Sequence, residues 1–153
     1  MVRLPARVRS QSGAELVEFA LVLPLLLLVF GGIVDFGLLL QRQQVVTNAA
    51  REGARLAILP GYTLADVQAR VTQFVREGIN NPAAAPATSM STVTLTPGSG
   101  PPFQAARIEV RLVDRFLILG PIVSLSGGSS GSFGAITLSA NTTMRIETSA
   151  SGS

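Results

Sequence analysis

Two carboxylates stand at the entrance to a long apolar stretch. Glu15 and Glu18 lie in the run SGAELVEFALVLPLLLLVF, which begins at Ser12. A carboxylate beside hydrocarbon is costly unless something neutralises it. One explanation is that both acids complement the dipole at a helix start, an effect of about 0.3–1 kcal/mol each. The other is a cut after Gly13, which would give Ala14 a free ammonium group that neutralises Glu18 of a neighbouring subunit.

The rest of the chain offers few groups for catalysis. It contains no cysteine and no histidine, which excludes thiol chemistry, disulfides and the commonest general base and metal ligand. Residues 127–131 fit the G-x-S-x-G pattern of hydrolases, but no histidine is present to activate the serine. The nine acidic residues are scattered rather than clustered as a metal site requires. We therefore predict no catalytic residue, no metal site, no cofactor and no enzyme activity.

The positive charge of the chain is concentrated at its start. The net charge is +3 and the pI is near 11.0, values that would fit nucleic-acid binding. However, Arg3, Arg7 and Arg9 precede the apolar run, and the remaining nine arginines face nine acids. No basic face is left to hold phosphates, so we predict no binding to nucleic acid.

The apolar stretch is long enough to cross a lipid bilayer. No residue from Phe19 to Val34 is charged, and after Asp35 the run 36–40 is apolar again. A spanning helix needs about 20 apolar residues, whereas the core of a secretory signal has about 7–15. We therefore predict a spanning helix that is not cut off as a secretory signal would be. Arginines flank both ends, so the positive-inside rule gives only a weak preference for a cytoplasmic N-terminus.

Asp35 is a transmembrane acid near the distal end of this helix. An ionised acid at the bilayer centre costs about 2.5–3.5 kcal/mol on insertion scales, and less near an interface. Arg42 lies two turns further on the same helix face and would draw Asp35 towards water. Two roles remain open for Asp35: simple snorkelling at the interface, or pairing between subunits.

The helix is predicted to continue beyond the membrane through residues 41–59. Small apolar side chains recur there every four positions and form a narrow stripe: Val45, Ala49, Gly53 and Ala57. Arg51, Glu52 and Arg55 lie off the stripe, and Glu52 is spaced to pair with Arg55. A helix over 16–59 would be about 66 Å long, so part of it would protrude from the membrane.

A small domain is predicted after Pro60. Thr63 is a helix N-cap with Asp66 three residues later, and an amphipathic helix runs to about residue 77. Residues 83–91 are predicted to be a loop. Alternating apolar residues then predict strands around 93–95, 107–112 and 136–146. The apolar piece 116–125 is either core or a surface for a partner.

The predicted fold class is therefore α+β. A long N-terminal transmembrane helix continues outside the membrane and is followed by a small domain. That domain has one amphipathic helix and an antiparallel sheet of about three strands.

The N-terminal region resembles a known kind of signal. A basic leader that ends in glycine, a glutamate five residues after the cut and an apolar helix resemble the class III signal of type IV pilins and pseudopilins. The closer resemblance is to the TadE-like family, the TadE/TadF pseudopilins of the tight-adherence (Flp) pilus system. It is carried by residues 13–21, 23–24 and 35–37, and above all by the helix motif at 48–55, which includes Arg51, Glu52, Gly53 and Arg55.

The resemblance implies a processed membrane protein. The leader 1–13 would be removed by a prepilin peptidase between Gly13 and Ala14. Residues 14–59 would be the transmembrane and protruding helix, and 60–153 an extracytoplasmic α+β domain. The chain would cross the cytoplasmic (inner) membrane once, with a cytoplasmic N-terminus and a periplasmic or extracellular C-terminal domain.

The implied function is assembly rather than catalysis. The chain is expected to be a minor pilin-like subunit, because bulk Flp pilins are much shorter and lack a β domain. Its implied partners are the prepilin peptidase, other pilin and pseudopilin subunits, the inner-membrane assembly platform and the lipid bilayer. The alternative is an uncleaved single-pass membrane adapter whose extracytoplasmic β domain binds a partner.

Overall fold

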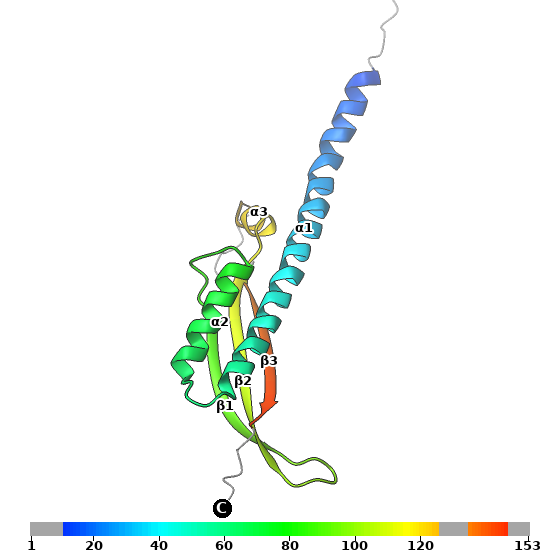
Figure 1. Cartoon of the computed structure of the whole chain (residues 1–153). Helices are drawn as coiled ribbons and strands as arrows, with labels where there is room; N and C mark the ends of the chain where they lie inside the picture. Colours follow the sequence, from blue (N-terminus) through cyan, green and yellow to red (C-terminus); the bar gives the residue numbers. More distant parts are fainter. Residues whose placement is uncertain (1–10, 126–134, 147–153) are drawn as a thin grey trace, which may run out of the picture.

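The computed structural model describes residues 11–125 and 135–146. Within these residues the elements follow the order α1 (Gln11–Ala57), α2 (Leu64–Gly78), β1 (Ala87–Leu95), β2 (Phe103–Arg115), α3 (Leu119–Leu125) and β3 (Ala135–Arg145). The distal half of α1 packs with α2 and the sheet into a small domain, and the N-terminal half stands clear of it (Figure 1). The predicted fold class, a long apolar N-terminal helix followed by a small α+β domain, is confirmed.

Helix α1 is the predicted spanning and protruding helix in one piece. It has 47 residues and contains Pro24, and at about 1.5 Å per residue it is about 70 Å long. Large apolar side chains from Leu16 to Leu40 are mostly exposed, including Leu21, Leu25 and Phe30. By length and composition, this part of the described chain could cross a membrane.

Helix α2 begins and ends where the sequence predicts. The Thr63 hydroxyl accepts the Asp66 N–H at 3.4 Å, and the Asp66 carboxylate accepts the Thr63 N–H at 2.8 Å, which completes a capping box. One face of the helix buries Val67, Val71 and Val75. The chain reverses just after the helix at Asn80, whose φ of 52° is left-handed.

The three strands form an antiparallel sheet in the order β1-β2-β3. In the central strand, Ile108 pairs with Met90 of β1 and with Thr142 of β3. Strand β1 begins at Ala87, so the predicted loop is wrong for residues 87–91. These residues are mainly small and polar, and most are exposed on an edge strand, so hydrophobic alternation could not reveal them.

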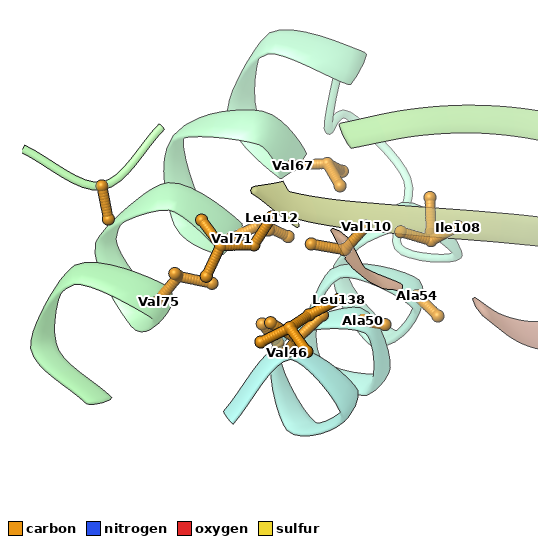
Figure 2. Packing of buried hydrophobic residues seen from close by; sticks show 12 residues of the cluster. Val46, Ala50, Ala54, Val67, Val71, Val75, Ile108, Val110, Leu112 and Leu138 are labelled. Atoms are coloured by element: carbon orange, nitrogen blue, oxygen red, sulfur yellow. The ribbon is translucent and has the colours of Figure 1, made fainter. Parts of the chain in front are cut away.

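The core lies between one face of the sheet and the two helices α1 and α2 (Figure 2). A Cβ atom on Gly53 would lie 2.8 Å from Cγ2 of Val71 and 3.4 Å from Cγ2 of Ile108, so the bare glycine permits this close approach of α1. The buried α1 residues belong to the predicted stripe of small residues or lie beside it: Val46, Ala49, Ala50 and Ala54. The opposite sheet face carries polar side chains such as Arg107 and Arg111.

The apolar piece 116–125 does not join this core. It contains the short helix α3, which the sequence did not predict, and lies beside the middle of α1 (Figure 1). Leu117 is 62% exposed and Ile122 is 39% exposed. The interpretation of this piece as core is therefore wrong, and it lies at the surface next to the apolar helix.

Candidate functional site

The two acids at the entrance to the apolar run have no partner in the described chain. Glu15 and Glu18 are exposed, as are Gly13 and Ala14. Neither carboxylate takes part in a hydrogen bond or ion pair among residues 11–125 and 135–146. The described part of α1 begins at Gln11, and both acids lie beyond its first turn.

Asp35 has a partner that the sequence did not reveal. Its side chain is only 3% exposed. Its carboxylate accepts four hydrogen bonds from three consecutive backbone N–H groups: Leu117 at 2.9 Å, Ile118 at 3.1 and 3.0 Å, and Leu119 at 2.8 Å. A carboxylate offers about four acceptor positions, so this donor set nearly saturates it. Sequence patterns give no indication of a bond between a side chain and backbone so distant along the chain.

Gly31 provides the space for this contact. It lies one helical turn before Asp35 and is on the same face of α1. A Cβ atom on Gly31 would lie 2.7 Å from Cγ2 of Ile118. The pair of Gly31 and Asp35 therefore forms a docking point on α1 for the segment that leads into α3.

The expectation that Arg42 draws Asp35 towards water is wrong. The Arg42 guanidinium instead donates from Nη1 to both carboxylate oxygens of Asp114, at the end of β2. This pair is partly buried, with side-chain exposures of 25% and 16%. The neighbouring residue on α1, Gln43, contacts β3: its Nε2 donates to the Ser139 carbonyl at 2.9 Å. Pairing of Asp35 between subunits stays a prediction.

Two residues of the helix motif at 48–55, Glu52 and Gly53, hold α2 against α1. Glu52 accepts hydrogen bonds from Arg70 of α2, from Nε at 3.3 Å and from Nη2 at 3.2 Å. It does not bond to Arg55, the partner that its spacing predicted. Gly53 is buried at the helix crossing, while Arg51 and Arg55 are exposed. The motif therefore combines two packing residues with two arginines that remain available at the surface.

The remaining described surface presents little organised chemistry. No group of three or more His, Cys, Asp or Glu side chains is placed to hold a metal ion within residues 11–125 and 135–146. A shallow open hollow runs along α2 and is lined mainly by polar residues such as Gln68, Gln73 and Arg76. These residues supply no pairing of a nucleophile with a base.

An exposed apolar helix that carries a small domain at its far end fits a single-pass membrane protein. A comparison with family models gives a match: residues 13–55 match the family described as TadE-like protein. The match starts at Gly13 and covers most of α1, including residues 51–55, while α2, α3 and the sheet lie outside it. Neither curated proteins nor solved structures gave a match.

The match confirms the resemblance seen in the sequence over these residues. A match to this family favours a membrane protein associated with the Tad pilus.

Proposed function

We propose that this chain is a minor pilin-like (pseudopilin) subunit that supports assembly of a tight-adherence pilus. Helix α1 would cross the cytoplasmic membrane with its N-terminus in the cytoplasm and carry residues 60–153 on the outer side. The observation that carries the proposal is the exposed apolar half of α1, which begins with two acids that have no partner in the described chain. The family match over residues 13–55 supports the same conclusion.

The mechanism begins with removal of residues 1–13. Cleavage after Gly13 by a prepilin peptidase would leave Ala14 with a positively charged amino group. This ammonium would pair with the Glu18 carboxylate of a neighbouring subunit as the two helices align. Charges 4 Å apart attract by about 1 kcal/mol in water and about 4 kcal/mol at an effective dielectric constant of 20.

The pair would fix the register of the helices more than it would hold them together. Apolar side chains such as Leu21, Leu25 and Leu28 face outwards along α1. Lipid tails are as apolar as leucine, so these side chains alone give neighbouring helices little preference for one alignment. An unpaired carboxylate at the same depth costs several kcal/mol, which penalises every misaligned register. Glu15 lies nearer the headgroups and would matter less.

The partners follow from this mechanism. The peptidase would act on the leader, and other pilin and pseudopilin subunits would pack against α1. The inner-membrane assembly platform would receive the assembled subunits. The exposed arginines Arg51 and Arg55 lie further along the same helix, well beyond its apolar part, where they are accessible to such partners.

The first experiment determines the N-terminus of the mature protein. Coexpression with the cognate peptidase should give a form that begins at Ala14, identified by mass spectrometry. Gly13→Val should prevent the shift, because a side chain at this position would obstruct access to the backbone. Gly37→Val is a matched control, since a Cβ atom at Gly37 meets nothing within 4 Å, and it should be cleaved normally. An intact Met1 in cells that assemble pili would overturn the proposal and favour the uncleaved adapter.

A further inference from the structure

The segment from Phe116 to Leu125 carries no charged residue and lies beside the apolar part of α1. Its Leu117 and Ile122 side chains are exposed, although a soluble domain would normally bury large apolar side chains of this kind. We propose that this segment is embedded in the outer leaflet of the membrane, docked on α1 by Gly31 and Asp35. The inference rests on one element of the proposed function, namely that α1 spans the bilayer.

The depth of the docking point supports this location. A hydrocarbon core about 30 Å thick needs about 20 helical residues, so a core that starts at Phe19 ends near Leu38. Asp35 then lies about 5 Å inside the distal boundary, and Gly31 about 10 Å inside it. Ile118 meets Gly31, and Leu119, the first residue of α3, binds Asp35. The segment is therefore held in the same layer as these two α1 residues. Interfacial helices typically reach a depth of about 5–10 Å.

The hydrogen bonds of Asp35 lower the free-energy cost of placing polar groups at this depth. Exposed backbone N–H groups in hydrocarbon are costly, and so is an acidic side chain. Here the carboxylate of Asp35 accepts the N–H groups of Leu117, Ile118 and Leu119. Each partner thus satisfies the polar group of the other, and the contact is sealed from solvent because Asp35 is buried.

Charged residues lie where the segment would leave the membrane. Asp114 and Arg115 directly precede the apolar run, and Arg42 pairs with Asp114. Arg42 lies about 6 Å beyond the estimated hydrocarbon boundary, at the level of the headgroups. The polar pair and the apolar segment therefore follow the same order along the membrane normal as the headgroups and acyl chains. This match of chemistry with depth favours lipid over another protein as the occupant of the exposed apolar surface.

The test uses tryptophan fluorescence, since the chain contains no tryptophan of its own. The full chain would be reconstituted in phosphatidylcholine vesicles whose acyl chains carry bromine, a quencher of nearby tryptophan. Leu117→Trp and Ile122→Trp should each lose most of their fluorescence relative to vesicles without bromine. Leu26→Trp, in the middle of the exposed apolar run, is the positive control. Leu95→Trp, exposed at the end of β1 far from α3, should keep its fluorescence (Figure 1).

The controls separate failure of the inference from failure of its premise. Quenching at position 26 without quenching at 117 and 122 would overturn the inference, leave α1 as a spanning helix and assign the apolar surface to a protein partner. Loss of quenching at position 26 would overturn the spanning helix and the inference together. Equal quenching at 26, 117, 122 and 95 would also overturn it, because the whole domain would then contact lipid without a specific docked segment.

Discussion

Asp35 and Ile118 are joined by two hydrogen bonds, from the Ile118 N–H to one carboxylate oxygen at 3.1 Å and to the other at 3.0 Å, although 83 residues separate them in the chain. Seven residues further along α1, Arg42 binds Asp114, which lies just before the same segment. These two contacts fix the position of the end of β2 along the axis of α1. The domain is thereby held at a defined distance from the apolar half of the helix.

The first prediction concerns this contact. Asp35→Ala removes the acceptor for three backbone N–H groups, and each buried donor left unpaired costs about 1–3 kcal/mol. We expect hydrogen exchange at residues 117–119 to accelerate about tenfold or more. The core around Val46 and Ile108 should stay protected, because it lies beyond the docking point.

Two further variants sharpen this measurement. Asp35→Asn keeps one carbonyl oxygen as an acceptor and should give an intermediate rate of exchange. Gln44→Ala changes an exposed α1 side chain and should leave the rates unchanged. Unaltered exchange at 117–119 in Asp35→Ala would show that the carboxylate does not hold the segment.

The second prediction concerns the crossing of α1 and α2. In Gly53→Ala the new methyl group would lie 2.8 Å from Cγ2 of Val71, within a packed core. Overpacking of this kind typically costs about 1–3 kcal/mol, more than the helix propensity of about 1 kcal/mol that alanine gains over glycine. Thermal unfolding in detergent, followed by circular dichroism, should show a lower midpoint.

Gly32→Ala is the matched control for this substitution. A Cβ atom at Gly32 meets nothing within 4 Å, so the gain in helix propensity is unopposed and the midpoint should stay or rise. A Gly53→Ala protein as stable as the parent would contradict the close approach of α2 to α1.

The third prediction concerns the start of α2 and its dependence on pH. The Thr63 side chain and then the Thr63 backbone N–H, both donating to the Asp66 carboxylate, lower the pKa of Asp66 below its ordinary value of 3.8. A lowered pKa in the folded state means that the stabilisation is present above the unfolded pKa and is lost as the pH falls through the folded pKa.

Asp66→Asn should therefore be less stable than the parent at neutral pH, and the difference should shrink below about pH 4. Unfolding by urea at pH 7, 5 and 3 measures this trend. Glu77→Gln changes an acid at the other end of α2 and serves as the control. A difference that stays constant over this range would show that the carboxylate does not form the cap.

The sequence was sufficient to predict the elements that have strong hydrophobic periodicity or a clear helix cap. The apolar run before Leu40, the cap at Thr63 and the alternation in β2 and β3 all reflect local physics, and the structure contains the corresponding elements. Strand β1 was partly missed, because small polar residues at an exposed edge show no alternation. Helix α3 was missed because it has only seven residues and includes Gly120 and Pro121.

The partners of the charged residues were harder to predict. Spacing within one helix led us to expect a pair of Glu52 with Arg55, and an Arg42 side chain that draws Asp35 towards water. The structure instead joins Glu52 to Arg70 and Arg42 to Asp114, which are contacts between elements. Such pairs depend on how the elements pack, and that packing is determined by the whole core. Local spacing therefore indicates which charges can meet on one helix, but not which tertiary partner competes for them.

The last prediction concerns Glu18, which has no partner among the described residues. Under the proposed function, Glu18 is dispensable for cleavage and required for assembly. The Ala14 ammonium of a neighbouring subunit would be its partner, in a setting where little water competes for either charge. We expect Glu18→Ala, Glu18→Asp and Glu15→Ala to lose the leader normally, as measured by mass spectrometry.

Their incorporation into crosslinked pilus complexes should differ. Glu18→Ala should be excluded, because the ammonium of its neighbour would be left without a carboxylate in the aligned register. Glu18→Asp should be incorporated in part, since its charge is retained but its reach is shorter by one methylene group. Glu15→Ala is the matched control and should be incorporated almost normally, as it removes the same kind of side chain nearer the headgroups. If Glu18→Ala assembles as well as the parent, the carboxylate does not set the register between subunits.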